Sequence, residues 1–148
     1  MKKKILAVAS NGGHLVQLLR LFPAFSEHDV HLISTSEDGP DETYNEYYSV
    51  TDSNFEQKFK LIKTAFETFI IYIKVRPDVV ISTGAAPGFF CLLYASIFRK
   101  KAIWIDSIAN TEKLSMAGGV ALKLTKHCYT QWPELAKEDG PLYLGAVI

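Results

Sequence analysis

Two short glycine-bearing segments hold the residues of this chain that could bind an anion and move a proton. They read Ser10-Asn11-Gly12-Gly13-His14 and Thr83-Gly84-Ala85-Ala86-Pro87-Gly88. Each follows an apolar run and precedes a helical pattern, so each sets backbone amides at a helix N-terminus, where an anion is favoured. Glycine lets the backbone approach such a ligand. The alternative for both segments is a tight turn that only packs a strand against a helix.

His14 closes the first segment and is the main candidate for proton transfer. A neutral imidazole, with a reference pKa of about 6.5, can accept a proton from a hydroxyl or donate a hydrogen bond to a phosphate. Its alternative is a capping or packing role. Asp106 follows another apolar run and could orient a sugar hydroxyl or act as a reserve base, or simply cap a helix. The remaining histidines lack a glycine-rich neighbourhood and are interpreted as structural: His28, His31 and His127.

Apolar runs that alternate with helical patterns predict an α/β fold with a parallel sheet. The predicted strands cover residues 3–9, 29–35, 47–50, 78–82, 102–105 and 128–131. Right-handed crossovers favour the strand order 3-2-1-4-5-6, in which the first and fourth strands are neighbours at a switch point. The segments after the first, fourth and fifth strands should then converge on one crevice.

Two predicted helices have marked apolar patterns. One carries Phe55, Phe59, Ile62, Phe66, Phe69 and Ile73 at intervals of three and four residues. This spacing predicts an amphipathic helix whose apolar face packs into the core, with Lys60 and Lys63 in solvent. Residues 89–98 are apolar on every side, so this helix is buried or meets something apolar. With the basic residues 99–101 it is also a candidate for peripheral membrane contact. A further helix is expected over residues 119–125.

Length and charge limit the class of protein. The chain has 148 residues, which predicts one domain over residues 1–148. Its 16 basic and 16 acidic residues give no formal net charge, which argues against a nucleic-acid binder. Cys91 and Cys128 lack the spacing of a zinc site and are expected to be reduced core residues. No apolar run reaches the roughly 18 residues of a membrane-spanning helix.

Four segments, in this order and spacing, resemble a known family. They are Val8-Ala9-Ser10-Asn11-Gly12-Gly13-His14-Leu15-x-Gln17-Leu18, Ser82-Thr83-Gly84-x-x-Pro87-Gly88, Trp104-Ile105-Asp106-Ser107-Ile108-Ala109-Asn110 and Tyr129-Thr130-Gln131-Trp132-x-Glu134-Leu135. The family is that of the acceptor-side, membrane-recruiting subunits of two-component UDP-sugar glycosyltransferases. The chain is similar, more distantly, to the N-terminal half of the lipid-linked GlcNAc transferase of peptidoglycan synthesis. The family often has Arg where this chain has Asn110, which removes a cation that could meet a phosphate.

The resemblance implies a Rossmann-like domain with helices on both faces of the sheet, one half of a GT-B glycosyltransferase. It implies a hexosyltransferase subunit that binds a lipid-diphosphate acceptor and recruits a donor-binding catalytic partner as a heterodimer. UDP-N-acetylglucosamine is the expected donor, with inverting transfer and no metal or cofactor. The pathway would be polysaccharide, exopolysaccharide or lipid-linked oligosaccharide biosynthesis, at the inner face of the cell membrane. One domain is half of such an enzyme, so the chain is expected to be inactive alone.

The expected site has two catalytic candidates, His14 and Asp106, and ten substrate-binding candidates. The latter are Ser10, Asn11, Gly12, Gly13, Thr83, Gly84, Pro87, Gly88, Ser107 and Asn110. Two other classes stay open. One is a nucleotide-binding oxidoreductase in which Glu37 or Asp38 holds a ribose, and the other is a non-catalytic flavodoxin-like binding domain. The absence of G-x-G-x-x-G after the first strand argues against the oxidoreductase.

Overall fold

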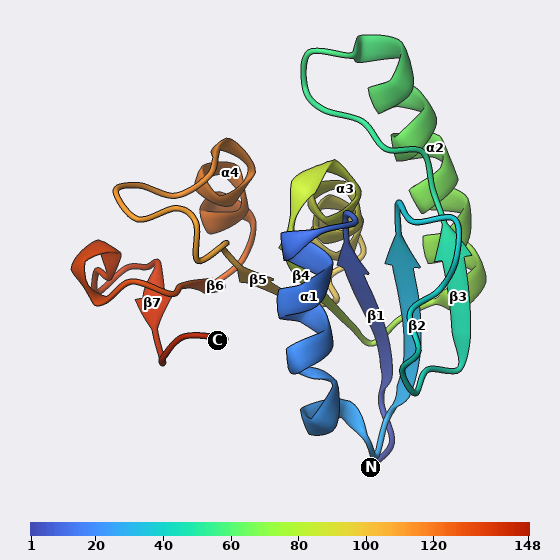
Figure 1. Ribbon diagram of the computed structural model, residues 1–148, viewed down its shortest axis with the longest axis horizontal. Coiled ribbons are helices and arrows are strands. Elements are labelled where there is room, and N and C mark those ends of the chain that lie inside the picture. Colours follow the sequence, from blue (N-terminus) through green and yellow to red (C-terminus); the bar gives the residue numbers. More distant parts are fainter.

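A seven-stranded, all-parallel sheet forms the centre of the computed structural model, which describes residues 1–148 (Figure 1). Its strands are β1 (Lys4–Ala9), β2 (Asp29–Ser34), β3 (Glu46–Ser49), β4 (Val79–Gly84), β5 (Lys101–Ile105), β6 (His127–Thr130) and β7 (Leu142–Tyr143). The order is β3-β2-β1-β4-β5-β6-β7, which confirms the predicted order of the first six. The two-residue strand β7 was not predicted, because so short a segment has no readable periodicity.

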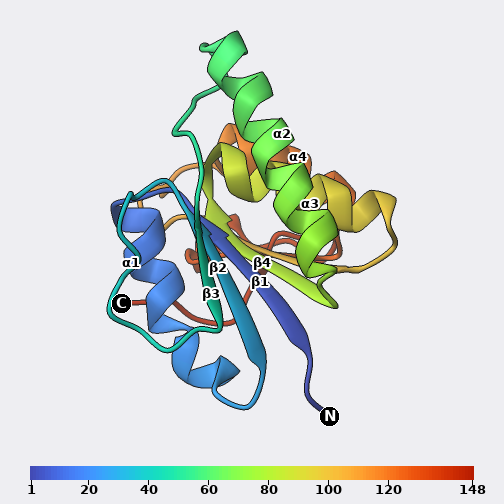
Figure 2. The same cartoon turned by 90° about the vertical axis from the view of Figure 1, so that its right-hand side faces the viewer.

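Helices cover both faces of the sheet, as Figure 2 shows: α1 (Gly13–Arg20) lies on one face and the other three helices lie on the opposite face. These three are α2 (Lys58–Val75), α3 (Ala85–Ile97) and α4 (Met116–Leu124). Two short 3₁₀ helices span Phe22–Phe25 and Pro133–Leu135. Helix α4 begins three residues before the predicted start, because the Ser115 hydroxyl accepts a hydrogen bond from the Gly118 amide and caps its N-terminus.

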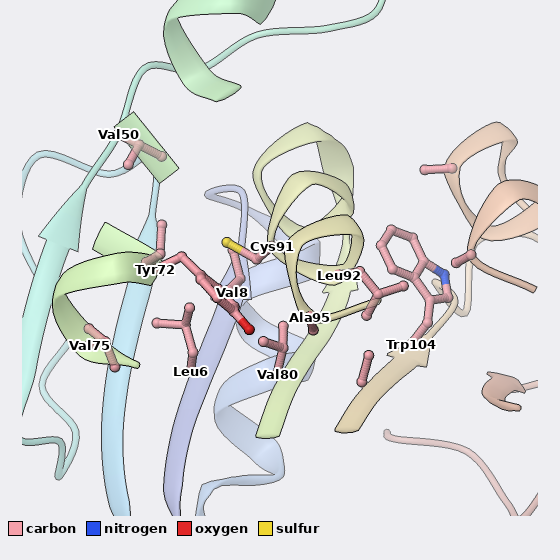
Figure 3. Packing of buried hydrophobic residues seen from close by; sticks show 14 of the residues in the cluster. Leu6, Val8, Val50, Tyr72, Val75, Val80, Cys91, Leu92, Ala95 and Trp104 are labelled. Carbon is pink, nitrogen blue, oxygen red and sulfur yellow. The ribbon is translucent and has the colours of Figure 1, made fainter. Parts of the chain in front are cut away.

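The alternating side chains of β1 divide the core into two layers. Leu6 and Val8 point toward α2 and α3, where they join a cluster that includes the fully buried Trp104 (Figure 3). Ile5 and Ala7 belong to the second cluster, beneath α1. A strand buried on both faces has to be apolar throughout, which explains the continuous apolar run seen in the sequence.

Helix α2 turns a different face to the sheet from the one predicted. Phe59, Ile62 and Phe66, expected in the core, are 91%, 66% and 64% exposed, whereas Thr64 and Thr68 are completely buried. The threonine hydroxyls are satisfied, since each donates to the backbone carbonyl four residues earlier. These bonds allow a polar face to be buried without an unpaired donor. The prediction that the apolar stripe packs into the core is therefore wrong.

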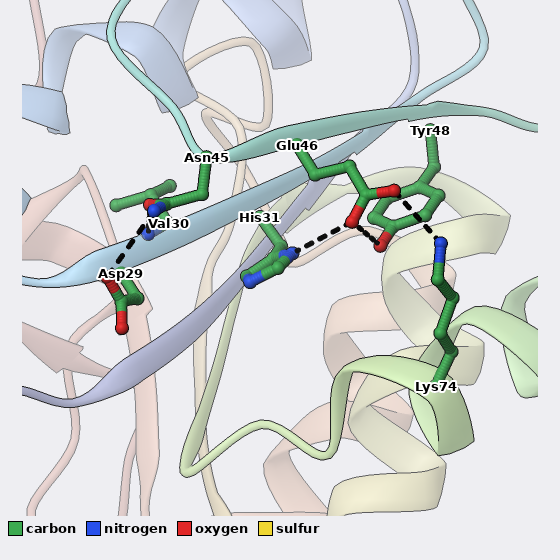
Figure 4. A network of polar contacts seen from close by, with 7 residues as sticks. All are labelled: Asp29, Val30, His31, Asn45, Glu46, Tyr48 and Lys74. Carbon is green, nitrogen blue, oxygen red and sulfur yellow. Dashed lines mark hydrogen bonds and ion pairs between the residues drawn. The ribbon is translucent and has the colours of Figure 1, made fainter.

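A polar network fastens the edge strand β3 to β2 and α2 (Figure 4). The Glu46 carboxylate accepts a hydrogen bond from the Tyr48 hydroxyl at 2.6 Å and from Lys74 at 2.9 Å. The ring nitrogen Nδ1 of His31 lies 3.9 Å from the same carboxylate. Burial lowers the pKa of His31 despite this opposing carboxylate. The hydrogen bond from Tyr48 lowers the pKa of Glu46.

These shifts predict that acid weakens the fold. A His31 pKa that is lower in the folded than in the unfolded protein means that the unfolded chain takes up the proton first. The free energy of unfolding should therefore fall as the pH drops below the ordinary histidine value of 6.5. In urea unfolding at a series of pH values, His31→Gln should reduce this slope. His127→Gln, whose ring forms no hydrogen bond, is the control, and equal slopes for both variants would contradict the assignment to His31.

Candidate functional site

The carboxyl ends of β1, β4 and β5 carry the three loops that sequence analysis singled out. Strand β1 pairs with β2 on one side and with β4 on the other. The connections after β1 and β4 therefore lead to opposite faces of the sheet, and we call the region between them, which is the usual ligand site of such folds, the crevice. Residues 10–14 form what we call the first glycine loop, and residues 83–88 form the second.

His14 and Thr83 join the two glycine loops by exchanging hydrogen bonds. The ring nitrogen Nδ1 of His14 lies 3.0 Å from the Thr83 carbonyl oxygen, and the Thr83 hydroxyl donates to the His14 carbonyl. Because a carbonyl oxygen can only accept, Nδ1 must carry the proton in this bond. The other ring nitrogen, Nε2, then has a free lone pair. This tautomer is the one that a general base requires.

Gly84 makes room for the His14 imidazole. A Cβ atom on Gly84 would overlap the ring atoms Nδ1 and Cε1, and its φ of +142° is one that other residues rarely adopt. The next residue, Ala85, also has a positive φ, of 71°. Such a conformation typically costs a non-glycine residue about 1–3 kcal/mol and is concentrated at functional sites. The second loop therefore holds strain directly beside His14.

Two helices start at these loops without a side-chain cap. The N-cap residues of α1 and α3 are Gly12 and Gly84, and neither helix has an acidic residue in its first turn. A Cβ atom added at Gly12 or Gly13 would meet nothing within 4 Å, so the first loop faces open space. The side chain of Asn11 accepts from the Gly12 amide at 2.8 Å. The next amides of α1 have no intrahelical partner and are available to an external anion.

The second glycine loop is less accessible than the sequence suggested. Thr83, Gly84, Pro87 and Gly88 are all buried. A Cβ atom on Gly88 would collide with the hydroxyl of Ser82, so this glycine permits α3 to pack closely on β4. Within this loop only Ala85 and Phe89 next to it are partly exposed. These buried residues therefore lie beneath the crevice, and Ser10, Asn11, Gly12 and Gly13 of the first glycine loop form its open side.

Asp106 has a structural environment that does not fit a base. Its side chain is 2% exposed, and its carboxylate accepts four hydrogen bonds. The donors are the Trp104 indole at 3.0 Å, the Asn110 amide at 2.9 Å, and the backbone amide and hydroxyl of Ser115 at 2.9 and 2.6 Å. Four donors leave no free lone pair for a substrate proton. The expectation that Asp106 is a reserve catalytic base is corrected to that of a positioning residue for the loop after β5.

The remaining predicted residues of this loop stabilise its turn. The Ser107 hydroxyl accepts from the Ala109 amide at 3.2 Å. The side-chain amide of Asn110 donates a hydrogen bond to the Asp106 carboxylate. Asn110, which stands where the family often has Arg, therefore makes its contact within the loop. None of the three loops, residues 10–14, 83–88 and 106–110, contains Lys or Arg. These three loops therefore offer an anion backbone amides, polar side chains and His14, but no Lys or Arg.

Two buried glutamines, Gln17 and Gln131, lie in motifs of the sequence and contact each other beside the crevice. The Gln131 amide nitrogen donates to the Gln17 side chain at 2.7 Å and to the Asp106 carbonyl at 2.9 Å, and its oxygen accepts from the Val147 amide at 2.7 Å. This residue thereby connects α1, the end of β5 and the C-terminal segment. The signal in the sequence was Gln17 itself, a polar residue among the leucines of an apolar helical face.

The chain has no group of three or more His, Cys, Asp or Glu residues placed to hold a metal ion. Cys91 and Cys128 are buried and unpaired, as predicted. Burial raises the pKa of both thiols, so neither is a reactive thiolate.

The sequence matches one protein family and several curated proteins. Residues 45–147 match the family described as "Oligosaccharide biosynthesis protein Alg14 like". The chain is 29% identical to the human UDP-N-acetylglucosamine transferase subunit ALG14 over 181 residues, covering 97% of this chain and 82% of the human protein. Identity to the subunit of the same name from Schizosaccharomyces pombe is 27%, covering 99% of this chain and 84% of the yeast protein.

Solved structures confirm the predicted Rossmann-like fold. MurG of Acinetobacter baumannii superposes with a TM-score of 0.72 at 13% identity, covering 97% of this chain and 45% of that protein. The UDP-GlcNAc 2-epimerase of Methanocaldococcus jannaschii gives a TM-score of 0.66 at 15% identity, covering 86% of this chain and 40% of the epimerase. At these identities the likeness concerns the fold alone. The chain spans less than half the length of both structures.

The contact between Gly84 and His14 yields a test of the site geometry. Gly84→Ala should displace the imidazole, because the new methyl group would occupy its position, and should destabilise the protein by about 1–3 kcal/mol. Gly13→Ala is the matched control, since open space surrounds that position and its φ is not positive. Histidine side-chain NMR and urea unfolding measure the two effects. An unmoved His14 resonance in Gly84→Ala would contradict the described geometry.

Proposed function

The chain belongs to the Alg14-like family, and we propose that it is the acceptor-side subunit of a UDP-sugar glycosyltransferase, with UDP-N-acetylglucosamine as the expected donor. The match over residues 45–147 extends over more than half of the chain. The curated relatives are described as transferase subunits. In this proposal the crevice between the glycine loops binds a lipid-diphosphate acceptor, and a donor-binding partner supplies the UDP-sugar.

The observation that carries the proposal is the position of His14. Its Nδ1 is held on the Thr83 carbonyl, which leaves Nε2 as the ring nitrogen that can accept a proton, and His14 closes the open first glycine loop. A group that transfers a proton has to be held rigidly and in the correct tautomer. Thr83 of the second glycine loop meets both requirements. Its backbone carbonyl fixes the tautomer of the His14 ring, and its hydroxyl donates to the His14 carbonyl and holds the residue in place.

The proposed reaction uses His14 as a general base. The acceptor hydroxyl oxygen forms a bond to the anomeric carbon of the donor sugar, and the bond from that carbon to the UDP oxygen breaks. The hydroxyl proton passes to Nε2 of His14, while UDP leaves with the electron pair of the broken bond. Attack from the side opposite the leaving group inverts the anomeric centre. A positioned base of this kind typically contributes 10²–10⁴-fold, or about 3–5 kcal/mol of the barrier.

The acceptor diphosphate is proposed to bind at the N-terminus of α1. The open first loop and the uncapped amides of α1 favour an anion there. With no Lys or Arg in the three loops, the helix dipole and the amides are the attractive groups that this chain offers. The acceptor hydroxyl and the diphosphate would then lie on the two sides of His14.

A second subunit is part of the proposal. The curated relatives are named as subunits of a UDP-N-acetylglucosamine transferase. This name supports a heterodimer in which the donor site lies on the partner. Because the acceptor is lipid-linked, we place the complex peripherally at the inner face of the cell membrane, in polysaccharide or lipid-linked oligosaccharide synthesis. The comparisons do not favour the oxidoreductase, and its proposed ribose-binding residues, Glu37 and Asp38, are exposed loop residues.

The first experiment tests whether sugar transfer requires both subunits. The chain is assayed alone and after co-purification with its partner, using a panel of radiolabelled UDP-sugars and a lipid-diphosphate acceptor. We expect transfer by the complex and none by the chain alone, because in this proposal the donor site lies on the partner. Transfer by the chain alone would contradict the two-subunit arrangement. An assembled complex that transfers no sugar would contradict the transferase function.

The second experiment tests His14 in the assembled complex. His14→Ala should lower kcat by about 10²–10⁴-fold, with folding and partner binding unchanged, because it removes the base. His28→Ala, which lies outside the crevice, is the control and should leave both constants unchanged. A rise in the acceptor KM with kcat preserved would assign His14 to the diphosphate instead. Wild-type values of both constants would remove His14 from the site.

A further inference from the structure

Gln17 is a buried polar residue on the side of α1 that faces the sheet. It is only 7% exposed, and its neighbours Leu15 and Leu18 belong to the apolar cluster beneath the helix. Burying an amide is unfavourable unless its polar atoms find hydrogen-bond partners. The oxygen and the nitrogen of the Gln17 side chain therefore have to be accounted for separately.

Backbone groups determine how the neighbouring Gln131 amide is oriented. A backbone carbonyl can only accept and a backbone N–H can only donate. Gln131 must therefore turn its nitrogen to the Asp106 carbonyl and its oxygen to the Val147 amide. The second N–H of the same nitrogen donates to Gln17. Both N–H groups and the oxygen of Gln131 are thus occupied, and its amide cannot be reversed.

The fixed Gln131 amide in turn orients Gln17. Because Gln131 offers an N–H, Gln17 must present its oxygen Oε1 at this contact. Its nitrogen Nε2 forms no hydrogen bond within the chain. This nitrogen is not among the fully enclosed unpaired side-chain atoms, which are His31 Nδ1, Ser34 Oγ and the Tyr72 hydroxyl. Nε2 of Gln17 is therefore an oriented donor that a molecule outside the chain can reach.

This free donor lies on the same side of α1 as His14. The two residues are three apart in the helix, a spacing that sets their Cβ atoms about 5–6 Å from each other. Both side chains contact the sheet side, where His14 meets Thr83 and Gln17 meets Gln131. Helical side chains also lean toward the N-terminus of their helix, which here is the first glycine loop. The amide of Gln17 is thus placed at the crevice.

The two free nitrogens on this side of α1 have opposite hydrogen-bonding roles. Nε2 of His14 accepts a proton, whereas Nε2 of Gln17 donates. A sugar carries hydroxyls on neighbouring carbons, and each hydroxyl can both donate and accept. One hydroxyl can then donate to His14 while the next accepts from Gln17. A phosphate fits this pair less well, because an ionised phosphate oxygen has no proton for His14 and strong phosphate binding uses charged donors.

We propose that Gln17 binds a hydroxyl of the acceptor sugar, next to the hydroxyl that gives its proton to His14; this step rests on the proposed function. The amides at the N-terminus of α1 hold the diphosphate, and Gln17 recognises the sugar attached to it. A site built to hydrogen-bond a hydroxyl disfavours a ligand without one, because its buried polar group is then left unpaired. Gln17 therefore determines specificity for an acceptor that bears a sugar.

The first measurement follows the Gln17 side-chain amide by NMR, with the ¹⁵N-labelled chain in the assembled complex. The sugar-bearing probes are short-chain isoprenyl diphosphates that carry glucose, galactose or N-acetylglucosamine. The bare probe is the same isoprenyl diphosphate without a sugar. We expect a sugar-bearing probe to shift the Nε2 hydrogens of Gln17 and the bare probe to leave them in place. Gln57, an exposed glutamine at the N-terminus of α2, is the internal control. This measurement uses the wild-type chain and does not depend on the folding of a variant.

The second measurement compares the affinity of Gln17→Leu for the same probes. Loss of one hydrogen bond should weaken binding of the sugar-bearing probe about 3–10-fold, while binding of the bare probe stays at the wild-type value. Gln57→Leu is the matched control and should bind both probes as the wild type does. Equal weakening of both probes in Gln17→Leu would place the contact on the diphosphate and overturn the proposal.

The outcomes separate Gln17 from the proposed function. A sugar-bearing probe that binds without shifting the Gln17 amide would reject the role of Gln17, and transfer by the same complex would leave the transferase function standing. A sugar-dependent shift of Gln17 in a complex that transfers no sugar would support the binding role and reject the transferase function. A complex that binds neither kind of probe would reject the acceptor-side function, and the role of Gln17 with it.

Discussion

The hydrogen bonds exchanged by His14 and Thr83 are the interaction on which the candidate site depends. They join two loops that are 69 residues apart in sequence, so they form only when β1 and β4 are neighbours in the sheet. The same contact fixes the imidazole tautomer and requires a glycine at position 84. Strand order, loop conformation and the chemistry of one side chain are therefore decided together.

A second layer of buried polar groups supports the crevice from the side of β5. Asp106 is surrounded by four donors from Trp104, Asn110 and Ser115, and Gln131 links the Asp106 carbonyl to α1. Networks of this kind are stable when every member is satisfied, and they then hold a loop in one conformation. The carboxylate that looked like a second base thus helps to keep the loop after β5 in place.

The sequence by itself determined the parallel α/β fold, the order of six strands and the convergence of three loops, because apolar periodicity and crossover handedness are local or general rules. It did not determine which side of α2 is buried: periodicity shows that Phe59 and Phe66 share a face, but not whether that face meets the sheet or the surroundings. It likewise could not show that Asp106 is enclosed by donors or that His14 lies on Thr83. Those facts depend on contacts between residues distant in sequence, which exist only once the sheet has brought the strand ends together.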